Sequence, residues 1–351
     1  MIKLVLFFSF GLLCVLRLSA QPQAQPQTQP QSQSQSAIDT AAGLENNPGV
    51  YSIIVAQNDR IIYRRYFKGY DSATLFSEQS LTKSICSLLI GIAIDKGYLS
   101  SVDEKLVDIF PELKKDADPR KSEITIRAVM NQASGLWHEN LKSPFGIHHF
   151  LKQKDPAGYV LKQPLAGEPG KEWHYNNAAS YLLSAIITRA THMDIHEFAI
   201  KYLFAPLNIT EFRWLQMRDG TYDGSGLKGI FLRSADLLKI GELFLHNGVY
   251  DNRQVVPKKL VQLILDPDIT YPSTWGFEGS TYALDYYHAV YHGTAFLYGM
   301  GWGGQFVVIL PSLKAIVVIN ENAANKQAIE RSETFIRRIF PAILAQLSKI
   351  P

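Results

Sequence analysis

The stretch that decides the fold runs from residue 80 to residue 96 and reads SLTKSICSLLIGIAIDK. It is almost wholly apolar after its first turn, and Gly97 follows it as a typical helix stop. A helix that is apolar on every side lies inside a protein rather than on its surface. The stretch therefore predicts a buried helix around which the other elements pack.

Ser80 and Lys83 stand at the start of this helix. A spacing of three places both side chains on one helix face, with Cβ atoms ~5–6 Å apart. A serine hydroxyl becomes a nucleophile only when a nearby base takes its proton, and burial lowers the pKa of a lysine toward the range of a general base. The N–H of Ser80, at the positive end of the helix dipole, also suits an oxyanion. The pair predicts a nucleophile and its base.

The spacing alone leaves a second interpretation open. Ser80 can be a helix cap and Lys83 a solvated charge of the first turn. Ser225 and Lys228 have the same spacing in a Gly-rich loop with no apolar helix after it. The pattern alone is therefore a weak indication of function.

Outward from this helix, strands are predicted near both ends of the chain and helices between them. The expected strands cover residues 50–56, 61–67, 305–310 and 315–320, and the clearest helices residues 178–190 and 234–247. A long amphipathic helix over residues 326–347 is interrupted by Pro341, and Ser101 with Glu104 has the pattern of a capping box. These elements predict one sheet built from both ends of the chain, with a mostly helical region at about residues 119–271 inserted.

Two further motifs carry candidate chemistry. Tyr175-Asn176-Asn177 precedes a helix, and a tyrosine passes a proton when nearby cations lower its pKa from ~10. Residues 298–305 read YGMGWGGQ and run into a strand, where glycines let the backbone approach a ligand and a strand N–H can serve an oxyanion. Each motif also has a structural interpretation: a buried tyrosine beside an Asn cap, and a Gly-rich turn.

Taken in order, SxxK, YxN and a Gly-rich strand start resemble the serine β-lactamase and penicillin-binding-protein superfamily. Six segments resemble the class C β-lactamase-related hydrolases: EQSLTKSICSLLIGIAIDKGYLS, ITIRAVMNQASGL, WHYNNAASYLLSAII, LFAPLNIT, GLKGIFLRSADLLKIGELFLHNGVY and GMGWGGQFVVILPSLKAIVVIN. That group includes esterases, 6-aminohexanoate-dimer hydrolases, D-aminopeptidases and D-alanyl-D-alanine carboxypeptidases. The resemblance implies an α/β (α+β) sandwich of the β-lactamase/transpeptidase type, with an antiparallel sheet flanked by helices plus a helical region.

The resemblance also implies roles for individual residues. Ser80 would be the nucleophile, Lys83 its base, Tyr175 the second acid/base and Asn177 the hydrogen-bonding partner of the second motif. The remaining site residues lie in the third motif, where the N–H of Trp302, or of Gly304 in another register, would join that of Ser80 in an oxyanion hole beside Gly301.

One departure from the family bears on the substrate. Many relatives have Lys-Thr-Gly or His-Thr-Gly in the third motif, whereas this chain has residues 299–301, Gly-Met-Gly, and no cation there. The resemblance therefore implies a serine hydrolase that cleaves a small ester, an amide or a short peptide through an acyl-enzyme, with no metal or cofactor. Two alternatives stay open: a β-lactamase or D-alanyl-D-alanine carboxypeptidase, and an inactive penicillin-recognising binding domain.

The N-terminal residues look like an export signal. Lys3 is followed by an apolar stretch shorter than the ~20 residues of a membrane span, with cleavage expected after Ala20 to give a periplasmic or extracellular protein; a retained anchor is the alternative. Residues 21–38, rich in Gln, Pro and Ser, predict a disordered tether that can hold the hydrolase domain, residues 39–351, near a membrane or wall.

The composition limits the other possibilities. The net charge is +3 and the basic residues form no run, which argues against a nucleic-acid partner. The chain has two cysteines, Cys14 and Cys86, and cleavage at Ala20 would remove the first. The mature domain would then contain no internal disulfide and would depend on its core for stability.

Overall fold

The computed structural model describes residues 38–40, 42–44, 47, 49–139, 144–323 and 326–349. The predicted signal peptide and all but the last residue of the predicted tether lie outside this part. That last residue, Ile38, is buried against the C-terminal helices of the domain.

One eight-stranded antiparallel sheet forms the centre of the molecule, in the order β2-β1-β13-β12-β11-β10-β9-β8. Its strands are β1 (Val50–Gln57), β2 (Arg60–Tyr66), β8 (Tyr271–Pro272), β9 (Thr281–Ala283), β10 (Tyr286–Tyr291), β11 (Thr294–Gly301), β12 (Gln305–Leu310) and β13 (Ala315–Glu321). The N-terminal hairpin β1–β2 joins the C-terminal strands through β13, so the sheet draws on both ends of the chain, as predicted.

Side chains alternate along the central strands because successive residues of a strand point to opposite faces. Ile53 and Ile319 pair in the sheet and face the C-terminal helices, whereas their neighbours Ile54 and Val318 face the other side, where the helix at residues 234–245 packs on β1 and β13. Two hydrophobic cores result, one on each face of the sheet.

The central helix α2 (Leu81–Asp95) is the one predicted from the apolar stretch, and all its residues up to Ala93 are buried. It packs against β11 on one side and α7 on the other. The helices on the two faces of the sheet are α9 (Ser234–Leu245), α10 (Lys258–Leu265), α11 (Ala328–Thr334), the π-helical turn η6 (Phe335–Ile339) and α12 (Phe340–Leu347). Pro341 lies two residues after the π-helical turn η6, and the backbone on both sides of it is helical, so the predicted interruption is local and the helical run continues through α12.

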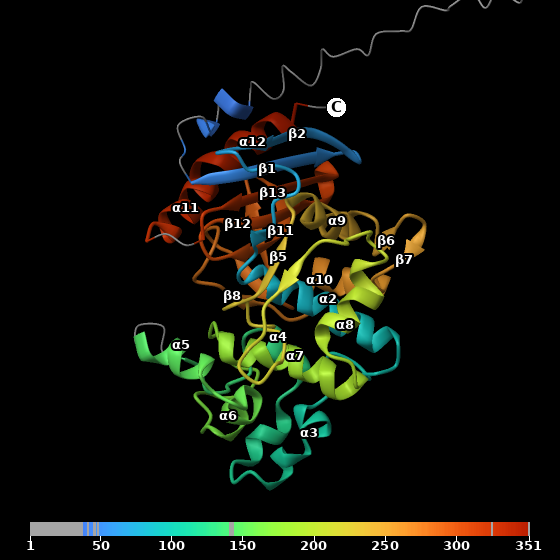
Figure 1. The fold of residues 1–351 in the computed structure, drawn as a ribbon, viewed down its shortest axis with the longest axis vertical. Coiled ribbons are helices and arrows are strands. Elements are labelled where there is room, and N and C mark those ends of the chain that lie inside the picture. Colours follow the sequence, from blue (N-terminus) through green and yellow to red (C-terminus); the bar gives the residue numbers. More distant parts are fainter. Residues whose placement is uncertain are drawn as a thin grey trace, which may run out of the picture.

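The helical part lies below the sheet in Figure 1. It comprises α3 (Leu106–Ile109), η2 (Pro111–Lys115), η3 (Pro119–Glu123), α4 (Ile126–Met130), α5 (Pro144–Leu151), α6 (Pro156–Lys162), α7 (Asn177–Thr191), α8 (Ile195–Ala199) and η4 (Ile200–Phe204). Short strands flank it: β3 (Phe76–Ser77), β4 (Arg213–Trp214), β5 (Ile230–Leu232), β6 (Val249–Tyr250) and β7 (Arg253–Gln254), and the turn η5 (Pro311–Leu313) joins β12 to β13. The fold is thus an antiparallel sheet flanked by helices with a helical region attached, which confirms the predicted class.

The predicted capping box is wrong. Glu104 accepts hydrogen bonds from the N–H and the hydroxyl of Ser100, and no helix begins at Ser101. The next helix, α3, begins only after Lys105, whose extended backbone forms a β-bridge with Thr125. The tertiary bridge therefore overrides the local signal.

Candidate active site

Ser80 stands where a strained turn meets the first turn of α2. The residue before it, Gln79, has a φ of +51°, a conformation that side chains other than glycine rarely adopt and that concentrates at functional sites. A backbone hydrogen bond anchors this turn: the N–H of Glu78 donates to the carbonyl oxygen of Ile230 at 2.9 Å. Ser80 is half-buried and its hydroxyl makes no capping hydrogen bond to the helix.

Lys83 is 1% exposed, so it is not the solvated charge of the alternative interpretation. Its Nζ lies 3.0 Å from the Ser80 Oγ and 2.8 Å from the Asn177 Oδ1. A third contact joins Nζ to the carbonyl oxygen of Ser225. The structure thus brings the predicted nucleophile, base and asparagine into direct contact.

The two adjacent asparagines at the start of α7 have different roles. Asn176 caps the helix, because its Oδ1 accepts from the N–H of Ala179 at 2.8 Å. Asn177 instead directs its Oδ1 to Lys83. Tyr175 comes to the same place: the Lys83 Nζ lies 4.9 Å from the centre of its half-buried ring.

Glu139 fixes which way the Asn177 amide points, and sequence reasoning did not assign it a role. This buried carboxylate accepts from the Asn177 Nδ2 at 2.6 Å and from the N–H groups of Asn177 and Ala178, each at 3.1 Å. With the amide nitrogen bound to Glu139, the amide oxygen is left to face Lys83. The sequence signal was only a lone carboxylate after Leu136-Trp137-His138.

The Gly-rich motif forms the end of β11 and the turn into β12. Its glycines lie directly against Leu81 in α2 and against Glu78, just before α2. A Cβ at Gly299 would lie 2.3 Å from the Leu81 Cδ2, and a Cβ at Gly301 would lie 2.2 Å from the carbonyl oxygen of Glu78. Only glycine permits this approach. Trp302 follows directly and its side chain is 48% exposed.

Gly304 occupies the other side of the same turn. Its φ is +94°, and a Cβ there would lie 2.8 Å from the Glu321 side chain on β13. Within the motif, Gly301 therefore contacts the segment before Ser80, whereas Gly304 contacts the neighbouring strand.

The second SxxK match does not form a site. The Ser225 hydroxyl donates to Asp223 at 2.5 Å, and the Lys228 Nζ donates to the carbonyl oxygen of Gln216 at 2.8 Å. Arg233, a second cation outside the third motif, forms a bidentate pair with Asp236 at 2.7 and 3.2 Å. These cations are engaged elsewhere.

A buried carboxyl, Asp285, lies behind Lys83. It accepts from the hydroxyl of Tyr282 at 3.1 Å and from the Gln132 Nε2 at 3.5 Å. Burial raises the pKa of Asp285 to about 8, although the charge of Lys83 opposes the shift. Gln132 also accepts from the N–H of Asn176 at 2.7 Å, so the second motif and this carboxyl share one hydrogen-bond network.

Other candidate groups lie apart. His192 ends α7 and His196 lies in α8, with Asp194 as the N-cap between them, so they do not share one helix. Within the described ranges, no group of three His, Cys, Asp or Glu side chains has the arrangement of a metal site. Across the same residues, no helix has the length and apolar character needed to cross a membrane.

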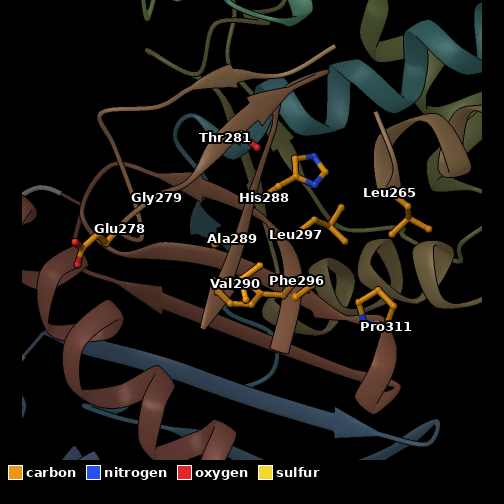
Figure 2. Close-up of a pocket in the computed structure, with 11 residues that line it drawn as sticks. Leu265, Glu278, Gly279, Thr281, His288, Ala289, Val290, Phe296, Leu297 and Pro311 are labelled. Carbon is orange, nitrogen blue, oxygen red and sulfur yellow. The ribbon is translucent and has the colours of Figure 1, made fainter. Parts of the chain in front are cut away.

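A hollow of about 490 Å³ lies beside β10 and β11 (Figure 2). His288, Leu297 and Leu265 line one side of it, and none of the predicted site residues does. Burial lowers the pKa of His288 to about 4, so its ring is neutral at pH 7. Glu278 is the charged residue in the lining, and the hollow lies apart from the predicted site residues.

Comparison with known proteins identifies the family. The family model described as Beta-lactamase matches residues 37–338. The chain belongs to the beta-lactamase family. The predicted resemblance is confirmed.

Relatives in the beta-lactamase family include hydrolases and acyltransferases. The chain is 24% identical over 225 residues to the 6-aminohexanoate-dimer hydrolase of Paenarthrobacter ureafaciens, covering 61% of this chain and 56% of that protein. It is 26% identical over 164 residues to the acyltransferase mokF of Monascus pilosus, covering 40% and 38%. The matches thus span about half or less of the length of these relatives.

Solved structures share the fold of this chain. Simvastatin synthase from Aspergillus terreus superposes with a TM-score of 0.66 at 16% identity, covering 91% of this chain and 99% of that chain. The octameric penicillin-binding protein homologue from Pyrococcus abyssi gives a TM-score of 0.66 at 17% identity, covering 90% and 77%. The β-lactamase/transpeptidase-like architecture is therefore the fold of this chain.

Proposed function

We propose that this protein is a serine hydrolase that cleaves a small ester or amide through an acyl-enzyme on Ser80. One observation carries the proposal: the buried Lys83 nitrogen lies between the Ser80 hydroxyl and two carbonyl oxygens, those of Asn177 and Ser225. As a general base Lys83 has to act through its neutral form, which has two N–H donors and one lone pair. In that form the two carbonyl oxygens would take both donors and leave the lone pair for the proton of Ser80.

The reaction follows from this arrangement. Lys83 takes the Ser80 proton while Oγ attacks the carbonyl carbon of the substrate and forms a tetrahedral oxyanion. We assign the stabilising N–H groups to Ser80 and Trp302, because Gly301 packs against Glu78 whereas Gly304 packs against Glu321. Tyr175, beside the lysine, relays to the leaving group the proton that Lys83 has taken. Water then attacks the acyl carbon, its proton returns to the Ser80 oxygen, and the acyl group leaves as an acid.

The substrate class follows from the charges at the third motif. Classical β-lactams and D-alanyl peptides have a carboxylate near the scissile bond, and a charged hydrogen bond to it contributes ~1.5–3 kcal/mol. Residues 299–301 supply no cation, and Arg233 and Lys228 have partners elsewhere. We therefore favour neutral esters or amides over β-lactams, with the exposed Trp302 ring beside an apolar acyl or alkyl group. We further propose that the enzyme acts outside the cytoplasm after cleavage near Ala20.

The test is active-site labelling with a fluorophosphonate probe. Wild type should form one adduct that peptide mapping places on Ser80, and Ser80→Ala should lose the label at nearly unchanged melting temperature. Ser87→Ala is the matched control, because this buried serine lies two turns along α2 and its hydroxyl donates to the carbonyl oxygen of Leu284; it should label normally. The wild-type preparation should hydrolyse p-nitrophenyl butyrate with a higher kcat/KM than nitrocefin.

Three results would reject the proposal in different ways. A label on Ser225, or labelling that survives in Ser80→Ala, removes Ser80 as nucleophile. Absence of any label in folded wild type favours the inactive binding domain instead. A kcat/KM for nitrocefin of ~10⁶ M⁻¹s⁻¹ or above, the level of an efficient enzyme, would promote the β-lactamase.

A further inference from the structure

A network of buried, hydrogen-bonded polar side chains connects the segment before Ser80 with the Gly-rich turn that contains Trp302. Its central residue is Asn320 on β13, which is fully buried. The Asn320 Nδ2 donates to both carboxyl oxygens of Glu78, at 3.1 and 3.2 Å, and to the Gln305 Oε1 at 3.2 Å. Glu78 lies two residues before Ser80, and Gln305 directly follows the turn of residues 302–304.

Two serine hydroxyls fix the orientation of the Asn320 amide. Its Oδ1 accepts from the hydroxyls of Ser234 at 2.7 Å and Ser52 at 3.2 Å. Because hydroxyls occupy the oxygen, the NH₂ group has to face Glu78 and Gln305. An asparagine held at all its polar atoms is a rigid connector between two segments.

Gln305 transmits this connection to the turn. Its Nε2 donates to the carbonyl oxygen of Glu321 at 2.8 Å and approaches that of Trp302 at 3.5 Å. Its Oε1 also accepts from the N–H of Glu321 at 3.2 Å. The side chain thus holds the turn of residues 302–304 against β13.

Glu78 is the member of the network that lies in the segment before Ser80. Its side chain is fully buried, and Asn320 is the polar partner that its carboxyl has among the described residues. Its own carbonyl oxygen is the group against which Gly301 packs. Glu78 therefore meets the third motif twice, through its side chain by way of Asn320 and through its backbone directly.

We propose that Glu78, Asn320 and Gln305 are positioning residues that hold the N–H groups of Ser80 and Trp302 at a fixed separation; this rests on the function proposed above. Oxyanion donors act only when both lie 2.7–3.1 Å from the developing negative charge. The two donors belong to distant segments, and the buried bridge is the polar connection between them. Burial also raises the pKa of Glu78 well above its usual range, although the hydrogen bond from Asn320 opposes the shift.

The test compares Glu78→Ala with Glu78→Gln. The alanine breaks the bridge, and we expect kcat for p-nitrophenyl butyrate to fall roughly ten- to a hundred-fold, less than or similar to the loss of one oxyanion donor. KM should stay within about twofold, and binding of a phenylboronic acid, which forms a tetrahedral adduct on the serine, should weaken in proportion to kcat. Glutamine is neutral and keeps an oxygen for the Asn320 amide, so Glu78→Gln should recover most of both values.

Ile343→Val in α12 is the control, because it trims a buried side chain in the opposite core. It should lower the melting temperature without changing kcat or boronate binding. Unchanged kcat and boronate affinity in folded Glu78→Ala would overturn the inference, and so would a rise in KM alone. If Glu78→Ala does not fold, Gln305→Ala decides by the same two measurements.

Failure of the bridge and failure of the proposed function give different results. If Ser80 is the nucleophile but the bridge has no role, Glu78→Ala takes up the fluorophosphonate at the wild-type rate. If Ser80 is not the nucleophile, the label is absent from Ser80 in wild type itself.

Discussion

At the scale of single residues, the site is defined by how few ways its polar groups can be arranged. Lys83 has three oxygen partners and almost no exposed surface. Asn177 meets Lys83 through its oxygen and Glu139 through its nitrogen, so turning the amide over would break contacts on both sides. Each group therefore determines the orientation of the next.

Glu139, the last group in this series of contacts, gives a prediction. Glu139→Gln replaces one acceptor oxygen by a donor NH₂ group, which has to face the N–H of Ala178 or the amide of Asn177. We expect kcat/KM to fall about tenfold or more and the free energy of unfolding to fall by about 1–3 kcal/mol, the cost of leaving a buried donor unpaired. Steady-state kinetics and urea unfolding measure the two effects.

Glu172→Gln is the matched control, since that side chain is largely exposed and contacts His174 at the surface. It should behave as wild type in both measurements. Wild-type kinetics in Glu139→Gln would show that Asn177 holds its orientation without the carboxylate.

Some of these residues could be predicted from sequence and others could not. Ser80, Lys83, Tyr175 and Asn177 belong to short motifs whose spacing has a chemical meaning. Glu139, Glu78 and Asp285 are lone carboxylates whose partners lie far away in the chain. Their role depends on tertiary contacts, and no local spacing reports those.

At the scale of elements, the contact between β11 and the start of α2 decides the geometry of the site. Gly301 lets the strand pass directly over the Glu78 carbonyl oxygen. The neighbouring Trp302 is the residue to which we assign the second oxyanion donor. The separation of the two backbones therefore sets the position of that donor.

Gly301→Ala tests this contact. The new methyl group would lie 2.2 Å from a backbone oxygen, which cannot rotate away as a side chain would. The strand has to shift, and we expect kcat for p-nitrophenyl butyrate to fall at least tenfold while the protein stays folded. A Cβ at Gly167 meets nothing within 4 Å, so Gly167→Ala should keep wild-type kinetics. Equal kinetics in the two variants would mean that the backbones have room to adjust.

Sequence patterns predicted the most strongly apolar elements well, but they missed the strands β10 and β11 and the two-residue strands. The strand β12 (Gln305–Leu310) and the helix α2 have strong apolar patterns, and their predicted bounds agree with the structure to within a residue or so. Strands such as β3 (Phe76–Ser77) and β4 (Arg213–Trp214) have two residues each, too few for any period to appear. They exist because β5 lies beside them in the fold.

At the scale of the whole molecule, the sheet and the helical part meet at the turn between β9 and β10. The N–H of Asp285 donates to the carbonyl oxygen of Met130 at 2.8 Å, and that of Leu284 donates to the Asn131 Oδ1 at 2.7 Å. The buried Asp285 carboxyl lies in the same junction, next to Tyr282 and within the field of Lys83.

This carboxyl makes stability depend on pH. Its pKa is about 8 in the folded protein against 3.8 ordinarily, so the folded state keeps a proton that the unfolded chain releases. The stabilising effect is complete below about pH 4 and is lost as pH rises toward 8. The free energy of unfolding should therefore decline from pH 5.5 to pH 7.5, and Asp285→Asn should reduce that slope by about 1.4 kcal/mol per pH unit, the value for one proton.

Urea unfolding at several pH values measures the slope. Glu321, with a pKa also raised by burial to about 8, should keep part of it in the Asp285→Asn variant. Asp95→Asn, at an exposed carboxylate paired with Lys96, should leave the slope unchanged. A wild-type slope in Asp285→Asn would show that this carboxyl is ionised in the folded protein.

The pairing of β1 with β13 has a consequence for how the chain reaches this fold. Ile53 finds its partner Ile319 only after nearly the whole domain has been synthesised. Closing such a long loop costs chain entropy before any contact repays it, so the sheet assembles late and slowly. Until then the apolar α2 has no sheet to cover it and is exposed to aggregation, which makes the nascent chain a natural client for chaperones.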